Sequence, residues 1–474
     1  MDEVLRTEQL VRRSFGDPVL NGMDLSLYRN EILGIAGLNG SGRSALTDVL
    51  SGLKGYDDGF IYLEDKPVRY HSVLEAQQLG IYCIRHKSTL IEKLTIADNF
   101  CILPPRKIGE WRIKKRQDTL FTKTILDELN IPIDFNREVQ TLSLAEKHLI
   151  EIARAGSADA KVIILDDIML SYTEKEYWDL YRLLKRIQSL RIALIVIDSK
   201  LDRLLQIAGR LIVIRSGRNI GFFYAEEFNE LQIQKVLTGT DFVISSVDAS
   251  PKSGKNLLTA TGICNQHLHD ISFNIKKGEV VGFVDEGSDN CRAIIDLLNG
   301  NAAIEQGQIL LDNRELFLHG GKRAMTVQGI GYIGYYKASL FPHLSLAENL
   351  TIVGVGQFSG ELGINTRMER FVVGEYASKL GIDRHDLNKQ VQWVDNRTQI
   401  NVALYKWMVA KAKIVVMDNT FSGTDITMHN CIYDFISEAK KCKMGIIYTS
   451  PYAQEVYKTS DRVYRIRDGC IIGR

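Results

Sequence analysis

The stretch NEILGIAGLNGSGRSALTDVLSG, residues 30–52, decides the fold of this chain. It begins with the apolar run ILGIA, passes through a glycine-rich loop at residues 37–44, and continues into the helix-forming residues ALTDVLSG. A strand, a loop of the pattern G-x-x-x-x-G-K-[ST] and a helix together bind phosphate groups, because loop amides and the helix amino end face the anion. The stretch therefore predicts a phosphate-binding loop at the end of a buried strand.

The same plan occurs a second time in the chain. The stretch GEVVGFVDEGSDNCRAIIDLLNG starts at Gly278 and aligns with the first without a gap. Downstream, GFIYLEDKPV (residues 59–68) is matched by GQILLDNREL (residues 307–316), and LTIADNF (residues 94–100) by LSLAENL (residues 344–350). Such self-similarity indicates an internal duplication of about 240 residues. We expect two domains, residues 1–241 and 242–474.

Composition narrows the class of protein. The 474 residues are 45% hydrophobic and 25% charged, which is typical of soluble globular proteins, and the net charge is +1. That balance argues against a surface built to bind nucleic acid. No stretch reaches the roughly 18 apolar residues of a membrane span, and the N-terminus lacks the apolar core of a signal peptide. The seven cysteines include no Cys-x-x-Cys pair, so a reducing cytoplasm is expected.

Each half alternates strands with helices, which predicts an α/β fold with a largely parallel sheet. Strands are expected at residues 32–36, 162–165 and 194–197, with counterparts at 280–284, 414–417 and 445–448. The segment LAEKHLIEIARA, residues 144–155, has helical periodicity. Ser143 precedes it and Glu146 follows three residues later, which predicts a capping box.

The loop and one further strand carry the residues that could do chemistry. Arg43 stands where lysine is usual, and it keeps the charge but offers a planar fork instead of a point charge. The hydroxyl of Ser44 is placed to hold Mg²⁺. The strand VIILDDIM ends in Asp166 and Asp167. Asp166 is a candidate Mg²⁺ partner, and Asp167 is either a base that activates water or a solvated strand end.

These motifs, in this order, resemble the tandem ATP-binding subunit of ABC importers for ribose, galactose and related sugars. The resemblance covers nearly the whole chain. It rests on the phosphate loop, the segment LSLAEKHLIEIARA, the strand VIILDDIM and the ending LIVIRSGRNIG, with KIVVMDN and SDRVYRIRDGCIIG in the second half. It implies two ABC-type (P-loop NTPase) nucleotide-binding domains, each with a mixed sheet core and a helical subdomain, that use ATP and Mg²⁺.

The resemblance also implies roles for individual residues. Phe15 matches the aromatic that stacks on adenine, Asp166 the Mg²⁺-linked aspartate, and Asp167 the position of the catalytic glutamate. His86 falls at the γ-phosphate-sensing glutamine and Ser199 at the histidine that contacts the γ-phosphate. The residues that match the phosphate loop are Gly37, Asn39, Gly40, Ser41, Gly42, Arg43, Ser44 and Ala45. The residues that match the signature motif, which faces the loop of the opposite half, are Ser143, Ala145 and Glu146.

Several positions depart from that family's pattern. In the first half, Arg43, His86, Asp167 and Ser199 replace lysine, glutamine, glutamate and histidine, and Ala145 replaces the key glycine. The second half departs further. Its loop reads DEGSDNCR at residues 285–292, its signature VDNRT at residues 394–398, and its acidic strand ends in Asp418 and a neutral Asn419. Carboxylates where phosphate would lie repel a triphosphate.

We therefore expect one ATP at most per chain, held with Mg²⁺ at the first loop, with weak or absent hydrolysis. By resemblance, the chain works at the cytoplasmic face of the membrane with ABC permease subunits and a sugar-binding protein, and contacts neither sugar nor nucleic acid itself. One alternative is a pseudo-ATPase scaffold or regulator that docks on a membrane partner without driving transport. Another, a tandem ABC protein acting on ribosomes, is disfavoured by the short linker and the net charge of +1.

Overall fold

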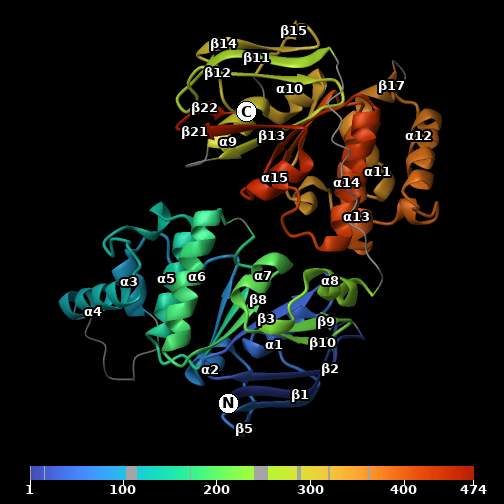
Figure 1. The fold of residues 1–474 in the computed structure, drawn as a ribbon. Coiled ribbons are helices and arrows are strands. Elements are labelled where there is room, and N and C mark those ends of the chain that lie inside the picture. The colour runs from blue at the N-terminus through green and yellow to red at the C-terminus, as the bar shows by residue number, and fades with distance from the viewer. Residues whose placement is uncertain are drawn as a thin grey trace. The chain divides into compact units, whose positions relative to one another are not determined.

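The computed structural model describes residues 2–14, 16–102, 115–170, 172–239, 255–285, 290–318, 321–360 and 363–473. The chain divides into two compact units, Met1–Phe242 and Val243–Arg474 (Figure 1), and each is described by itself. Most of the predicted linker, residues 240–254, lies outside the described residues.

The first unit contains two sheets. A four-stranded antiparallel sheet has the order β2-β1-β4-β5, and a six-stranded sheet has the order β10-β9-β3-β8-β7-β6. In the larger sheet the five strands from β9 to β6 are parallel, and only β10 pairs antiparallel, with β9. The strands are β1 (Glu3–Ser14), β2 (Asp17–Tyr28), β3 (Ile32–Gly37), β4 (Asp58–Leu63), β5 (Lys66–Val68), β6 (Ile81–Arg85), β7 (Val162–Asp166), β8 (Ala193–Ile197), β9 (Arg210–Arg215) and β10 (Arg218–Tyr224).

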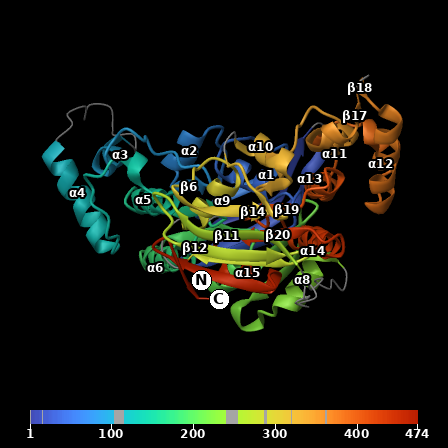
Figure 2. The same cartoon turned by 90° about the horizontal axis from the view of Figure 1, so that it is seen from above.

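Helices cover the larger sheet of the first unit. The helices are α1 (Arg43–Leu50), α2 (Val73–Gln78), α3 (Ile96–Ile102), α4 (Lys115–Glu128), α5 (Leu144–Gly156), α6 (Glu174–Ser189), α7 (Leu201–Ile207) and α8 (Glu230–Thr238). Helices α3 and α4 pack on each other and project from the sheet (Figure 2). With the segment that leads to α5, they form the helical part of this unit.

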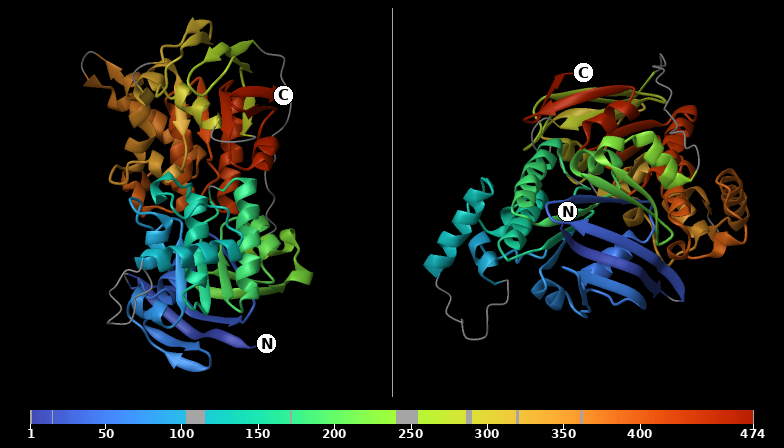
Figure 3. Two further views of the ribbon diagram at one scale, coloured as in Figure 1. Left: turned by 90° about the vertical axis from the view of Figure 1, so that its left-hand side faces the viewer. Right: turned by 60° about the horizontal axis from the view of Figure 1, so that its bottom comes forward.

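The central strand β3 shows why the apolar runs are continuous. Ile32 belongs to the core cluster shared with α5 and α6, whereas Leu33 belongs to the cluster shared with the antiparallel sheet. Figure 3 shows this antiparallel sheet, in blue, packed beside the parallel one. A parallel strand covered on both faces must be apolar at every position, which is the pattern read in the sequence.

The second unit repeats this architecture. Its antiparallel sheet has the order β12-β11-β14-β15, its larger sheet the order β16-β19-β20-β13-β21-β22, and a small ribbon pairs β17 with β18. The strands are β11 (Asn256–Cys264), β12 (Ile271–Lys276), β13 (Val280–Asp285), β14 (Gln306–Leu311), β15 (Arg314–Glu315), β16 (Ile330–Ile333), β17 (Ser359–Gly360), β18 (Gly363–Ile364), β19 (Ile414–Asp418), β20 (Gly445–Thr449), β21 (Arg462–Arg467) and β22 (Cys470–Gly473). The helices are α9 (Asn290–Leu298), α10 (Gly321–Gln328), α11 (Leu346–Thr351), α12 (Thr366–Lys379), α13 (Asn396–Val409), α14 (Ile426–Lys441) and α15 (Ala453–Thr459).

The six strands predicted from the apolar runs are all present, as β3, β7, β8, β13, β19 and β20. The predicted capping box is confirmed as well. Ser143 is the N-cap of α5, its hydroxyl accepts from the Glu146 backbone at 3.1 Å, and the Glu146 carboxylate accepts from the Ser143 backbone at 2.8 Å. Among the described residues, no helix is both long and apolar enough to cross a membrane.

Candidate functional site

The candidate site lies at the carboxyl edge of the parallel sheet in the first unit. Strand β3 ends at Gly37, β7 at Asp166, β6 at Arg85 and β8 at Ile197, and these strands run in the same direction. The residues that follow parallel strands therefore gather at one edge of the sheet. This topology brings the predicted loop, Asp166, Asp167, His86 and Ser199 to the same edge.

The loop after β3 depends on its glycines. Gly40 has φ +82°, and a Cβ atom there would meet nothing within 4 Å. Gly42, the N-cap of α1, has φ +107°, and a Cβ atom there would lie 2.6 Å from the carbonyl oxygen of Val19. A side chain at Gly37 would lie 2.4 Å from the hydroxyl of Ser41. Only glycine fits these positions, and the resulting backbone leaves the amino end of α1 without a side-chain cap.

Two buried polar atoms of this loop lack hydrogen-bond partners within the described part of the chain. They are the hydroxyl of Ser41 and Nη1 of Arg43, whose residue is 6% exposed. Nη2 of Arg43 donates to Oδ1 of Asn39 at 3.4 Å, and Nη1 lies 3.8 Å from Oδ1 of Asp167. Buried donors are normally satisfied, so the loop has the chemistry of a site that receives an anion. The donor set fits phosphate groups.

Two carboxylates, Asp166 and Asp167, lie next to each other at the same edge. Burial, and then the charge of Asp167, raise the pKa of Asp166 to about 6, while Arg85 and Arg43 act in the opposite direction. Asp167 follows directly with φ +50°. A bound cation would stabilise the ionised form of Asp166, so this residue and the exposed Ser44 fit the predicted Mg²⁺ position.

Asp198 is a third carboxylate at this edge, and the sequence reasoning did not identify it. It is 1% exposed, and burial together with the charge of Asp167 raises its pKa to about 7. Its Oδ1 accepts from the backbone of Lys200 at 2.7 Å. The hydroxyl of the adjacent Ser199, a predicted site residue, has no hydrogen-bond partner in the described residues. The signal was present, because Asp198 directly follows the apolar strand β8 just as Asp167 follows β7.

His148 is a second residue that the sequence reasoning missed. Its Nδ1 lies 2.8 Å from the hydroxyl of Tyr172, and its Nε2 lies 3.1 Å from the backbone oxygen of His86. Burial lowers the pKa of His148 to about 4, so the ring is neutral at physiological pH. The buried ring joins α5 to the predicted phosphate-sensing segment at His86 and to the segment that follows Asp167. Helical periodicity alone marks this position only as buried.

The signature-like residues are engaged by other side chains of the first unit. Besides its capping contacts, the Ser143 hydroxyl donates to Glu176 at 3.2 Å, and Glu146 pairs with Arg137 at 3.1 Å. Ala145 is buried in the core, and Ala45, in the first turn of α1, is partly buried and packs against the core. Phe15, the expected adenine-stacking residue, lies outside the described residues.

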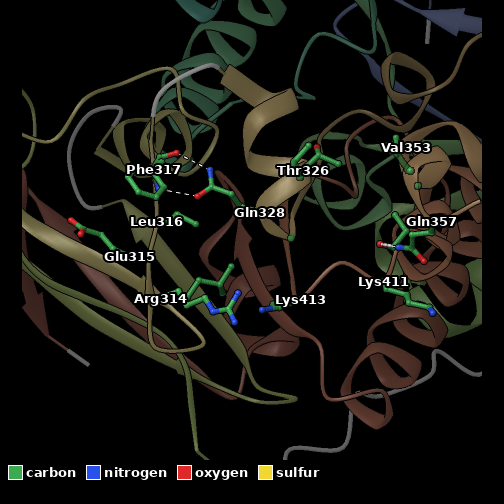
Figure 4. Close-up of a pocket in the computed structure, with 16 residues that line it drawn as sticks. Arg314, Glu315, Leu316, Phe317, Thr326, Gln328, Val353, Gln357, Lys411 and Lys413 are labelled. Atoms are coloured by element: carbon green, nitrogen blue, oxygen red, sulfur yellow. Dashed lines mark hydrogen bonds between the residues drawn. The ribbon is translucent and has the colours of Figure 1, made fainter. Parts of the chain in front are cut away.

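A pocket of about 700 Å³ lies in the second unit, away from the strand ends considered so far. Its lining is mostly apolar and neutral and includes three basic residues, Arg314, Lys411 and Lys413. Figure 4 shows Gln328 bonded to the backbone of Phe317. Lys413 precedes β19, whereas Asp418 ends that strand. The pocket is therefore at the amino edge of the parallel sheet and is not the counterpart of the phosphate loop.

The architecture and the loop define the class of protein: each unit is an ABC-type domain of the P-loop fold, and the chain is a tandem of two. The family model described as ABC transporter matches residues 20–169. Over the full chain, the sequence is 27% identical to Ribose import ATP-binding protein RbsA of Caldanaerobacter subterraneus subsp. tengcongensis, of which 96% is covered. It is 25% identical over 99% of the chain to the Putative ribose/galactose/methyl galactoside import ATP-binding protein 1 of Agrobacterium fabrum, of which 94% is covered.

These relatives confirm the resemblance to the tandem ATP-binding subunits of sugar importers. A solved structure, RNase-L Inhibitor, is similar over 98% of this chain and 88% of its own, with a TM-score of 0.61 and 16% identity. At that identity the likeness concerns the fold alone.

Proposed function

We propose that this chain is the ATP-binding subunit of a sugar-type ABC import complex, with ATP and Mg²⁺ bound at the loop of the first unit. The observation that carries the proposal is a pair of buried donors without a hydrogen bond within the described residues, Ser41 Oγ and Arg43 Nη1, the second of which lies 3.8 Å from the Asp167 carboxylate. A triphosphate supplies acceptors to both. The names of the full-length relatives support ATP binding and sugar import as the setting.

In this proposal, the loop and two residues outside it bind different parts of ATP and Mg²⁺. The loop amides and the amino end of α1 bind phosphate oxygens, and Arg43 adds a fixed charge. Ser44 and Asp166 hold Mg²⁺, and Phe15 stacks on the base. When bound, Mg²⁺ neutralises charge on the phosphate oxygens, and ATP supplies the anhydride bond that is cleaved.

Hydrolysis in this proposal is weak or absent. Asp167 takes the place of the base, but its side chain is one methylene shorter than glutamate, which sets the carboxylate back by about 1–1.5 Å and can cost on the order of 10²-fold in rate. Its Oδ1 also lies 3.8 Å from Nη1 of Arg43, so the carboxylate faces the side chain of the loop arginine. Ser199 cannot supply the positive donor of a histidine, and loss of one such donor costs about 10²–10³-fold.

The proposal places the chain at the cytoplasmic face of the membrane, bound to ABC permease subunits in a complex that also contains a sugar-binding protein. The chain itself contacts neither sugar nor nucleic acid. A second candidate function is a pseudo-ATPase scaffold that docks on a membrane partner without driving transport. It is favoured by the second unit, where Asp285 stands at the first position of the loop and neutral Asn419 follows Asp418.

Titration with ATP, with and without Mg²⁺, tests the binding claim. Replacing Arg43→Ala should weaken binding about 10- to 100-fold, because a hydrogen bond from a charged group contributes roughly 1.5–3 kcal/mol. Arg218→Ala is the matched control, since Arg218 is exposed on β10. Equal affinity in wild type and Arg43→Ala contradicts the site. Turnover of several ATP per second by the purified wild-type chain contradicts weak hydrolysis.

Adding membranes that contain the permease separates the two candidate functions. An import subunit should hydrolyse ATP faster when the permease and the loaded sugar-binding protein are present, because coupling requires the cycle to respond to substrate. A scaffold should bind the permease without any increase in hydrolysis. The measurement is steady-state phosphate release from reconstituted vesicles.

A further inference from the structure

The first position of the loop in the second unit is occupied by a carboxylate. Asp285, the last residue of β13, aligns with Gly37. Its Oδ2 accepts from the backbone N–H of Cys291 at 3.1 Å, in the first turn of α9, and its Oδ1 accepts from Nδ2 of Asn290 at 2.9 Å. Asn290 in turn accepts from the backbone of Gly469 at 2.9 Å. An anion belonging to the chain therefore binds the amino end of α9.

In the first unit, no side chain of the described residues caps the corresponding helix, and Nη1 of Arg43 lies 3.8 Å from Oδ1 of Asp167. Gly37 has no side chain, α1 has no side-chain cap, and the buried donors Ser41 Oγ and Arg43 Nη1 have no hydrogen-bond partner within the described residues. The two units thus share one local architecture, a strand followed by a helix. They differ in the group that accepts hydrogen bonds at the amino end of that helix. In the first unit, donors remain for an external anion, whereas in the second the Asp285 carboxylate is already bound.

An internal cation accompanies this anion. Arg292 aligns with Ser44, the residue at the predicted metal position. Its Nη1 lies 3.8 Å from Oδ2 of Asp418, and its Nε lies 3.2 Å from Oδ2 of Asp296. Asp418, the counterpart of Asp166, also accepts from the Tyr332 hydroxyl at 3.0 Å and from Thr449 at 3.1 Å. Because the Arg292 side chain is 59% exposed, this pairing is screened and secondary to the Asp285 contacts.

We propose that the Asp285 carboxylate is a built-in substitute for phosphate, so that the amino end of α9 is held in place without nucleotide. A carboxylate is stabilised at the amino end of a helix by the backbone N–H groups and the helix dipole. The same charge repels a phosphate group from that position. The part of this inference that assigns nucleotide binding to the first unit alone rests on the proposed function.

Amide hydrogen exchange measured on the full chain by mass spectrometry tests the inference, because it reports on α9 and α1 separately. In the wild type, inorganic phosphate, pyrophosphate and ATP with Mg²⁺ should leave exchange in residues 290–298 unchanged. Asp285→Ala should accelerate exchange at the start of α9 on the order of tenfold, as expected for the loss of a helix cap. Inorganic phosphate or pyrophosphate should then slow exchange in this variant towards the wild-type rate.

Glu305→Ala is the matched control, because it removes an exposed carboxylate of the same unit. Exchange at the start of α9 should be as slow in this variant as in the wild type. It should not change between phosphate and chloride of equal ionic strength. Asp285→Asn keeps the shape of the side chain without its charge, and it should give a smaller acceleration than Asp285→Ala.

Three results would overturn the inference: unchanged exchange in Asp285→Ala, accelerated exchange that neither anion slows, or a wild-type α9 that phosphate or ATP protects. If Asp285→Ala does not fold, exchange in α9 of the wild type, with and without phosphate or ATP, still tests the inference. Failure of the proposed function would appear elsewhere, as an α1 that does not respond to ATP.

Discussion

At the scale of single residues, the first unit concentrates opposed charges at one sheet edge. Arg43 is buried next to Asp167, and the charge of Asp167 adds to burial in raising the pKa values of Asp166 and Asp198. Without a ligand, these carboxylates are satisfied only in part. A phosphate anion and a divalent cation would together satisfy both signs of charge, which is why the edge suits a metal–nucleotide complex better than either alone.

Asp198→Asn tests this electrostatic account through its pH dependence. The pKa of Asp198 is about 7 in the folded chain, against about 3.9 for an unperturbed aspartate. Between these values the folded state holds a proton that the unfolded state has released, so stability falls as pH rises through this window. We expect Asp198→Asn to remove the cost of ionising a buried carboxyl. The first unit should therefore be more stable at pH 8 by on the order of 1 kcal/mol or more, but not at pH 4.

The measurement is thermal unfolding of the apo chain across that pH range, with exchange in β8 to assign the change to the first unit. Asp202→Asn, at an exposed carboxylate on α7, is the control and should show no such pH dependence. A stabilisation that is equal at pH 4 and pH 8 would show that ionisation of Asp198 is not the cause.

Some residues of the candidate site could be identified from the sequence, and others could not. Arg43, Ser44 and Asp166 are identifiable because a loop motif and a strand end have fixed spacing. The position of Asp198 after an apolar strand was visible as well, but its burial beside Asp167 was not, and His148 is identifiable only from its tertiary contacts with His86 and Tyr172. Spacing rules carry no information on such tertiary neighbours.

At the scale of elements, the turn from β3 into α1 sets the geometry of the site. Its backbone at Gly42 is left-handed, and a Cβ atom there would lie 2.6 Å from the carbonyl oxygen of Val19, so the neighbouring strand β2 also limits which residue this position accepts. The strands and the α5 cap were predictable because apolar runs and capping boxes are local signals. The placement of β3 between β8 and β9 was not, because strand order depends on long-range pairing.

Gly42→Ala should destabilise the first unit by about 2 kcal/mol or more, since it adds a Cβ atom in a left-handed conformation and in contact with backbone. Gly55→Ala is the matched control. Its Cβ atom would meet nothing within 4 Å, so its effect should stay within about 0.5 kcal/mol. Denaturant unfolding of both variants measures the difference. Equal effects would show that the loop tolerates a side chain at Gly42 and is less constrained than its contacts indicate.

At the scale of the whole molecule, one duplicated plan has produced two units with different local chemistry. The repeat read from the sequence predicts two similar halves, and the strand orders of the two larger sheets agree with it. Composition and periodicity could not show that Asp285 contacts the amide of Cys291, because residues on either side of a loop meet only once the turn is formed. The asymmetry of the two loops is therefore a property of the folded chain.

Calorimetric titration of the full chain with a nonhydrolysable ATP analogue and Mg²⁺ tests the central claim most directly. We predict a stoichiometry of one analogue per chain, with an affinity about 10- to 100-fold lower in Arg43→Ala and unchanged in Arg218→Ala. Two equivalents per chain, or none, would contradict the account.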